Sequence, residues 1–209
     1  HIKNSIFFDI DKHSNQNSKL PHMLPSKNDW ENIVANLGIK NSDHVIVYDN
    51  SEVFSACRVW YTFIYFGHDP NLISVLDGNC SKWLNEKKPT SNDTLKIVTS
   101  EYKAVEDTSL VINKDQVDEN IKNKTFQVID AGGEKRFLGL QPEPREGLRS
   151  GHVEGSINLP FQLLINNDRT FKKVDELSLI KVQDFCKNKG LKFFLSNNIK
   201  LAIKLNLDG

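Results

Sequence analysis

Residues 125–160, TFQVIDAGGEKRFLGLQPEPREGLRSGHVEGSINLP, decide how the rest of the chain is interpreted. The stretch opens with an apolar run at 126–129, followed by Asp130, Ala131, Gly132 and Gly133. A short apolar run that ends in glycines is typical of a buried strand leading into a loop. Because functional residues are often carried by loops on a rigid scaffold, we expect chemistry to follow this strand.

Two arginines, Arg136 and Arg145, lie nine residues apart in this loop. Pro142 and Pro144 between them restrict the preceding backbone to an extended form, so the chain must turn back and the two guanidinium groups can converge. A guanidinium group is a planar fork that suits a carboxylate. Composition alone favours a simpler alternative, surface ion pairs with nearby acidic side chains. The candidates for those pairs are Glu134, Glu143 and Glu146.

The block GHVEGSINLP at 151–160, preceded by QPEPREGLRS at 141–150, resembles the second domain of the two-domain rhodanese-type sulfurtransferases, closest to the 3-mercaptopyruvate sulfurtransferases. The resemblance implies an α/β fold of two tandem rhodanese-like domains, each a mainly parallel sheet covered by helices on both faces. It also implies that Arg136, in the pair Arg136-Phe137, and Arg145, after Glu143-Pro144, hold the carboxylate of the substrate.

The composition limits the classes of function. With 209 residues, 38% of them hydrophobic, the chain suffices for one large domain or two small ones. Lysine plus arginine and aspartate plus glutamate both number 27, so no overall field favours nucleic acid or an anionic membrane. We therefore expect neither nucleic acid nor a membrane as a partner.

The three cysteines, Cys57, Cys80 and Cys186, are widely spaced and follow no metal-ligand pattern. We therefore expect no disulfide framework, no metal site and no cofactor. A reducing compartment follows, with the cytoplasm as the first expectation and the mitochondrion as the alternative. Because the chain begins at His1 without a methionine, targeting stays open.

An internal repeat organises the chain. HIKNSI at 1–6 matches HVEGSI at 152–157 in its histidine, β-branched, serine and isoleucine positions. The repeat predicts a first domain at 1–88 and a second domain at 109–209, and the polar stretch at 89–108 predicts a connector between them. The resemblance implies that the first domain is non-catalytic and the second catalytic. By the same symmetry, the first copy lacks its opening strand. The resemblance implies that His1 lines the cleft between the domains and supports a hydrogen-bond relay; a histidine that closes a turn is the alternative.

Hydrophobic patterns predict alternating helices and strands, which favours parallel sheets. In the first domain the expected elements are a helix at 28–37, a strand at 43–49, a helix at 56–66, a strand at 72–76 and a helix at 81–85. The connector carries a strand-like piece at 95–98. In the second domain they are a helix at 115–122, a strand at 126–129, a helix or turn at 161–165, a helix at 174–189, a strand at 191–196 and a helix at 199–207. Cys57 then lies inside a helix and Cys80 in a turn, both as packed residues.

The place of the nucleophile is the main anomaly. The resemblance implies a reactive loop after the strand that ends at Ser196, with a cysteine followed by a Gly-Ser-Gly-type turn, but the sequence there reads Ser196-Asn197-Asn198. From Ser196 to Gly209 the chain spans 13 positions, whereas the first copy spans 18 from Asp49 to Gly67, a difference of five. Either a segment is missing here, as the similar deficits before His1 and after Gly209 indicate, or the protein is a degenerate relative without a nucleophile.

We therefore expect a sulfurtransferase that moves sulfur from 3-mercaptopyruvate to a thiol, cyanide or thioredoxin-like acceptor through a cysteine persulfide. The cysteine would follow Ser196, where backbone N–H groups and a helix N-terminus stabilise a thiolate. Thiosulfate is the alternative donor. A non-catalytic rhodanese-like module that binds a sulfur-carrier or redox partner is the alternative from another class.

Overall fold

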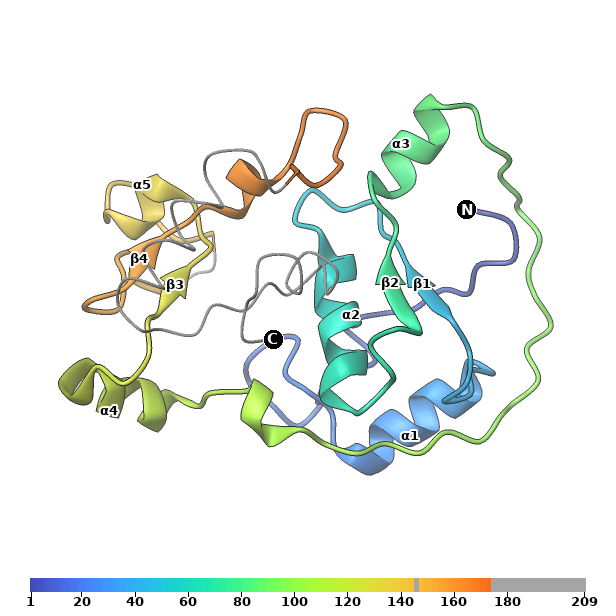
Figure 1. The fold of residues 1–209 in the computed structure, drawn as a ribbon, viewed down its shortest axis with the longest axis horizontal. Coiled ribbons are helices and arrows are strands. Elements are labelled where there is room, and N and C mark those ends of the chain that lie inside the picture. The colour runs from blue at the N-terminus through green and yellow to red at the C-terminus, as the bar shows by residue number, and fades with distance from the viewer. Residues whose placement is uncertain (145–146, 174–209) are drawn as a thin grey trace. The chain divides into compact units, whose positions relative to one another are not determined.

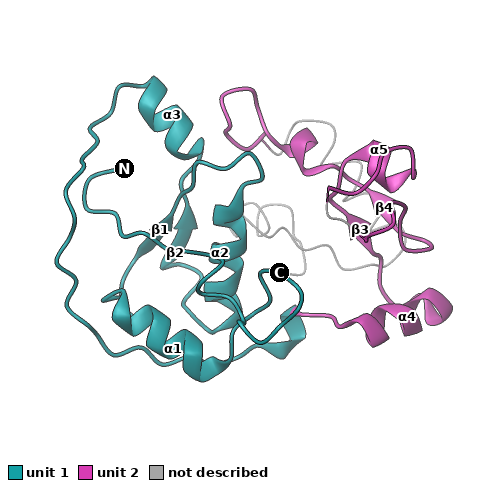
Figure 2. Ribbon diagram, turned by 180° about the vertical axis from the view of Figure 1, so that it is seen from behind, with its two compact units in different colours: residues 1–110 teal, residues 111–209 magenta. Residues whose placement is uncertain are grey.

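The computed structural model describes residues 1–144 and 147–173 (Figure 1). The chain divides into two compact units, His1–Leu110 and Val111–Gly209 (Figure 2). The domain limits inferred from the repeat stay a prediction; in this division the segment 89–108, expected as a connector, is counted with unit 1. The elements expected at 174–189, 191–196 and 199–207 lie outside the described residues.

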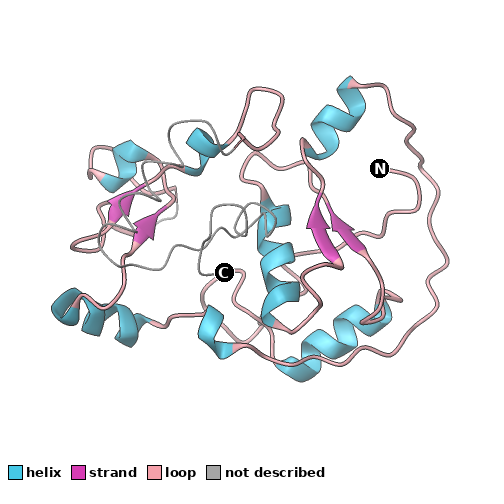
Figure 3. Cartoon of the chain, in the orientation of Figure 1, coloured by secondary structure: helices cyan, strands magenta, loops and turns pink. Residues whose placement is uncertain are grey.

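Unit 1 alternates helices and strands (Figure 3). Its elements are α1 (Lys27–Asn36), β1 (Val45–Val47), α2 (Ser55–Tyr65), β2 (Ile73–Val75), α3 (Asn79–Asn85) and a short 3-10 helix, η1 (Thr108–Leu110). The strands β1 and β2 pair in parallel, with Val45 opposite Ile73 and Val47 opposite Val75. The connection between them is α2, which packs against both strands, and the Trp60 indole donates to the Ile73 carbonyl at 3.3 Å. This is the βαβ arrangement that the alternating pattern predicts.

The helix α1 begins and ends one residue before the limits that its sequence predicts. The hydroxyl of Ser26 caps its N-terminus by accepting from the Asp29 amide at 3.2 Å. Trp30 and Val34, four residues apart, share its buried face. Beyond the helix, Gly38 has a φ of 72°, and a Cβ there would lie 2.7 Å from the Val98 carbonyl oxygen, so glycine is required on both counts.

Aromatic rings form the core of unit 1. The Trp30 indole meets Phe63 edge-on at 4.9 Å and stacks on Phe66 at 5.1 Å. His68 is only 1% exposed, and its two ring nitrogens bond the Tyr102 hydroxyl at 3.2 Å and the Asp43 carbonyl at 3.1 Å. Burial raises the pKa of Tyr102 to about 12. His68 is therefore a satisfied core residue.

The strand-like piece expected at 95–98 is wrong, because the structure assigns no strand there. This segment runs beside the C-terminal end of α1 instead. Ser100 donates its amide to Ala35 at 3.0 Å and its hydroxyl to Ile39 at 2.6 Å, while the Val98 carbonyl lies against Gly38. The stretch thus packs against the end of α1, and Ser100 after it bonds α1 and Ile39, so it is not part of the sheet.

Unit 2 contains α4 (Lys114–Asn123), β3 (Ile129–Asp130), α5 (Glu134–Phe137), β4 (Ile157–Asn158) and a 3-10 helix, η2 (Phe161–Leu164). A capping box of Asn113 and Gln116 starts α4. The strands β3 and β4 are parallel, with Ile129 opposite Ile157. The parallel pairs of both units confirm the α/β class.

The expected strand at 126–129 begins later than predicted. Asn120, on α4, donates its side-chain amide to the Phe126 carbonyl at 2.9 Å and accepts from the Phe126 amide at 2.9 Å. Because one side chain takes up both backbone groups of Phe126, that residue cannot join the ladder, and β3 is limited to Ile129–Asp130.

Candidate functional site

The loop after β3 is held in a fixed shape by two polar side chains. The Asp130 carboxylate accepts from the Gly132 amide at 2.7 Å. Asn158, opposite Asp130 on β4, donates its side-chain amide to the Asp130 carbonyl at 3.0 Å and to the Gly132 carbonyl at 2.8 Å. The start of the loop is thus anchored to the neighbouring strand. Sequence reasoning did not single out Asn158, because an asparagine beside a strand end has no periodic signal.

The four-residue helix α5 carries Arg136, and residues 151–152 hold it. Gly151 donates its amide to the Arg136 carbonyl at 2.9 Å. The His152 ring stacks on Phe137 with centroids 3.9 Å apart, and its Nδ1 bonds the Phe137 carbonyl at 2.8 Å. Because a carbonyl oxygen only accepts, this Nδ1 carries the proton. His152 therefore positions the helix that presents Arg136, a role that the sequence analysis missed.

The guanidinium of Arg136 is half-buried and already paired. Its Nη1 lies 3.4 Å from Oε2 of Glu143, with side chains 30% and 25% exposed, respectively. A Cβ added at Gly132 would lie 3.7 Å from Nη2 of Arg136, and one added at Gly133 would lie 3.9 Å from its Nε. The guanidinium therefore lies next to backbone that carries no side chain. Of the three acidic partners considered from sequence, Glu143 is thus the observed one. Arg145 and Glu146 lie outside the described residues, and convergence of the two arginines stays a prediction.

The two copies of the repeated motif form the same turn. Ser5 donates both its amide, at 3.2 Å, and its hydroxyl, at 2.6 Å, to the Ile2 carbonyl. Ser156 makes the same two bonds to Val153, at 3.0 and 2.6 Å. The residue before each serine is in the left-handed region, Asn4 at 65° and Gly155 at 77°.

The histidines of the two copies have different partners. The exposed His1 ring donates from Nε2 to the Asp93 carbonyl at 3.0 Å, and the terminal amine donates to Ser91. His152 instead holds α5. The relay implied for His1 involves the reactive loop; Ser196, Asn197 and Asn198, which flank it, lie outside the described residues. The role of His1 therefore stays a prediction.

In unit 1, a carboxylate occupies the strand end that corresponds to the reactive loop. Asp49 follows β1, and its Oδ2 accepts from the Ala56 amide in the first turn of α2 at 2.7 Å and from the Ser51 hydroxyl at 3.0 Å. The buried Asn79 donates to Asp49 Oδ1 and accepts from the Asp49 amide at 2.7 Å. Because a negative charge is favourable at a helix N-terminus, the Asp49 carboxylate stabilises the start of α2.

The described cysteines are not placed at a strand end. Cys57 is the third residue of α2 and is half-buried, so it is less enclosed than the core position that its helical location predicted. Cys80, in the first turn of α3, is buried as expected of a packed residue. Cys186 lies outside the described residues.

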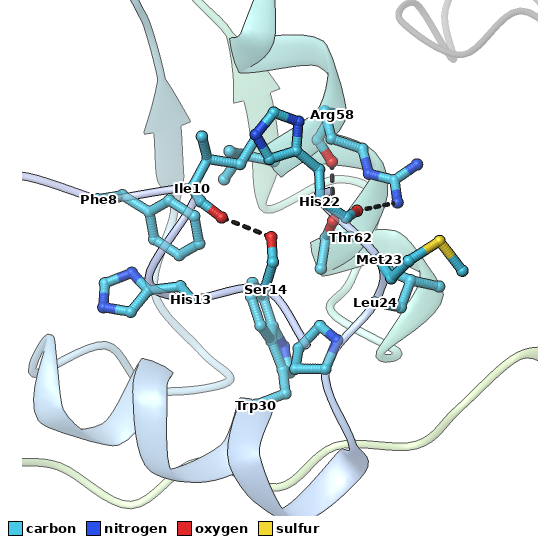
Figure 4. Close-up of a pocket in the computed structure, with 12 residues that line it drawn as sticks. Phe8, Ile10, His13, Ser14, His22, Met23, Leu24, Trp30, Arg58 and Thr62 are labelled. Carbon is cyan, nitrogen blue, oxygen red and sulfur yellow. Dashed lines mark hydrogen bonds between the residues drawn. The ribbon is translucent and has the colours of Figure 1, made fainter. Parts of the chain in front are cut away.

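A small pocket in unit 1 contains other polar groups but no expected site residue (Figure 4). Its volume of about 10 Å³ is room for roughly one water molecule. Arg58 donates to the His22 carbonyl at 2.7 Å, and burial lowers the Arg58 pKa. Nδ1 of His13 is buried with no hydrogen-bond partner in the described chain, and burial lowers the His13 pKa although Asp9 opposes the shift. The pocket is too small for a sulfur donor.

Two features are absent from the part of the chain that the structure describes. No cluster of three or more histidine, cysteine, aspartate or glutamate side chains there could hold a metal ion. No helix in that part of the chain is long and apolar enough to cross a membrane.

Comparison with known proteins assigns the fold to a class. Residues 1–86 match the rhodanese-like domain model. The structure superimposes on SseA from Escherichia coli, described as a 3-mercaptopyruvate sulfotransferase of rhodanese fold, with a TM-score of 0.75 and 31% identity over 86% of this chain and 66% of that one. It also superimposes on Tum1 from Saccharomyces cerevisiae, with a TM-score of 0.77 and 28% identity over 94% and 67%. The chain therefore contains a rhodanese-like domain at residues 1–86, and its fold is that of rhodanese-type proteins.

Sequence relatives narrow the group. Mouse 3-mercaptopyruvate sulfurtransferase is 38% identical over 179 residues, which is 85% of this chain and 60% of the relative. Rat thiosulfate sulfurtransferase is 39% identical over 183 residues, 86% and 61%. The chain is thus similar both to 3-mercaptopyruvate sulfurtransferases and to thiosulfate sulfurtransferases, and the tandem rhodanese-like fold expected from sequence is confirmed. The chain spans about three fifths of the length of these relatives.

Proposed function

We propose that the protein is a sulfurtransferase that takes sulfur from 3-mercaptopyruvate and passes it to a thiol, cyanide or a thioredoxin-like acceptor. The observation that supports this proposal most is the placement of Arg136, with a half-exposed guanidinium on a helix fixed just after the carboxyl end of β3. Similarity to proteins named 3-mercaptopyruvate sulfurtransferase supports the choice of donor.

In this proposal Arg136 and Arg145 bind the substrate carboxylate. Arg136 is held through its own carbonyl and through Phe137, so its fork has a limited set of orientations. A carboxylate bound by such a fork is oriented as well as attracted, which brings the thiol end of the donor to a defined place. Arg145 follows Pro144 and adds the second cation.

The sulfur step requires a cysteine thiolate in the loop after Ser196. The thiolate attacks the sulfur of 3-mercaptopyruvate, the carbon–sulfur bond breaks, and its electrons leave on carbon as the enolate of pyruvate, which then takes a proton. The enzyme keeps a persulfide. An acceptor thiolate or cyanide attacks the outer sulfur and releases the cysteine thiolate. Neither Cys57 nor Cys80 suits this role, because one lies inside a helix and the other is buried.

Thiosulfate is the second candidate donor. Relatives named thiosulfate sulfurtransferase are as similar as those named for 3-mercaptopyruvate, at 39% identity. A pair of guanidinium groups would also attract a dianion, although without the orientation that a planar carboxylate gives.

A non-catalytic module that binds a sulfur-carrier or redox partner is the candidate from another class. It is favoured by Asn197-Asn198, which stand where the family has its reactive cysteine. Sequencing the gene between Ser196 and Ile199 separates the two classes. If the two asparagines alone join these positions, no sulfur can be carried and the module is the better description.

Steady-state kinetics with both donors, and cyanide as acceptor, test the carboxylate site. Arg145→Ala should raise the KM for 3-mercaptopyruvate more than the KM for thiosulfate, because only the first donor has a carboxylate to hold. Arg136→Lys, which keeps the charge but loses the fork, should show the same preference. Arg149→Ala, an exposed arginine of the same loop, is the matched control. Equal effects on both donors would remove the carboxylate argument.

A further inference from the structure

We propose that Glu143 is a built-in competitor for the substrate carboxylate at Arg136, and so determines how tightly and how selectively the site takes its ligand; this inference rests on the proposed function. The observation behind it is that the group expected to meet an incoming carboxylate already meets one. Oε2 of Glu143 lies 3.4 Å from Nη1 of Arg136.

The backbone around Glu143 favours this contact. Pro142 and Pro144 flank the residue, so its own conformation is restricted to extended forms and little entropy is lost when the side chain is placed. Gln141, Pro142 and Pro144 are exposed, whereas Glu143 is half-buried. The glutamate is therefore directed back toward the body of unit 2.

Arg136 has no freedom to avoid the contact by moving its backbone. Gly151 bonds its carbonyl, and His152 holds the next residue. Glu134 is closer in sequence, on the same helix, but it is exposed and forms no described ion pair with Arg136. The fold of the loop therefore determines that Arg136 pairs with Glu143, because the glutamate nearer in sequence does not form this pair.

The ion pair changes what the site selects. An unpaired guanidinium that is 30% exposed would attract anions in general. With Glu143 in place the charge of Arg136 itself is balanced, so a ligand must offer a carboxylate that can take the place of the glutamate carboxylate. A planar, two-oxygen group meets that condition better than a sulfonate-like dianion does. Glu143 thus reduces affinity for every anion and reduces it least for carboxylates.

The test measures binding as well as turnover. Pyruvate is the carboxylate product of the proposed reaction. Calorimetry measures its binding to four full-length proteins: the wild type, Glu143→Gln, Glu143→Asp and Glu134→Gln. Glu143→Gln removes the charge with almost no change in size, and Glu143→Asp shortens the reach. Because a part-exposed ion pair of this kind is weak, both should bind pyruvate about two- to fivefold more tightly. Glu134→Gln, with the same charge change on the same loop, should leave the affinity unchanged.

Kinetics with the two donors complete the test. The KM for 3-mercaptopyruvate should fall by a similar factor in Glu143→Gln, and the KM for thiosulfate should fall more, so that selectivity for the carboxylate donor decreases. Weaker or unchanged pyruvate binding in Glu143→Gln would overturn the inference, because it would make Glu143 a support for Arg136. If instead Arg136→Ala binds pyruvate as well as the wild type does, the carboxylate site of the proposed function fails, and the inference fails with it.

Discussion

Replacing Asn79 with alanine should strongly destabilise unit 1. Asn79 is 1% exposed and links the end of β1 to the start of α3. Its side chain accepts from the Asp49 amide at 2.7 Å and donates to the Asp49 carboxylate. Alanine removes both bonds and leaves the Asp49 amide without its partner.

The magnitude follows from three contributions. The bond from the Asp49 amide is worth about 1 kcal/mol, and the bond to a charged carboxylate about 1.5–3 kcal/mol. Asn79 also has a φ of 57°, a left-handed conformation that costs alanine about 1–2 kcal/mol and asparagine less. The loss in the free energy of unfolding should be about 3–5 kcal/mol.

Urea unfolding followed by tryptophan fluorescence measures this loss, because the three tryptophans, Trp30, Trp60 and Trp83, all lie in unit 1. Asn79→Gly is the matched control: it removes the same two bonds but accepts the left-handed backbone, so it should be less destabilised than Asn79→Ala. The destabilisation of Asn79→Asp should be largest near neutral pH, because the new carboxylate would then face the Asp49 carboxylate. An Asn79→Ala protein within about 0.5 kcal/mol of the wild type would refute the assigned role of this side chain.

Three further substitutions test other parts of the structure. Asn158→Asp should cost about 2–3 kcal/mol, because a carboxylate cannot donate to the Asp130 and Gly132 carbonyls and is repelled by them; faster hydrogen exchange at 128–137 would show it, and unchanged exchange would contradict it. His13→Gln should flatten the dependence of stability on pH. Burial lowers the folded pKa of His13, so its contribution is fully present above the unfolded pKa of about 6.5 and is lost as the pH falls from there through the lower folded pKa. Urea midpoints between pH 7.5 and 5 measure this, and parallel curves for the two proteins would speak against it. Gly38→Ala should cost about 2 kcal/mol or more, since its φ is 72° and its Cβ would lie 2.7 Å from Val98; an unchanged melting temperature would show that the turn can relax.

The sequence predicts those parts of the fold that depend on periodicity and on local signals. The limits of α1 follow from Ser26 as its cap and from Gly38 as its end. The strands β1 and β2 are apolar runs in their expected places, although shorter than expected. The piece at 95–98 has the composition of a strand but lies against Gly38 at the end of α1, and Ser100, which follows it, bonds Ala35 and Ile39; these tertiary contacts are not visible in the sequence.

The candidate site is predicted less completely, because its fixed points are single polar side chains. The family resemblance identified Arg136, and composition offered three glutamates as partners. Only the three-dimensional path of the loop selects Glu143. Asn158 and His152 were missed, since a hydrogen bond to the backbone of a distant residue leaves no trace in the local sequence. Arg145 remains a prediction from resemblance.

The matching turns at Asn4-Ser5 and Gly155-Ser156 are consistent with an origin of the two units by gene duplication. Duplication of an ancestral gene that encoded one such turn would give both units a serine hydroxyl that donates to the carbonyl three residues earlier. Asparagine and glycine both tolerate the left-handed backbone, so either could later replace the other while the turn kept its conformation. The two units would then share a local turn that directs their folding, while the histidines of the two copies bond different residues, Asp93 and Phe137.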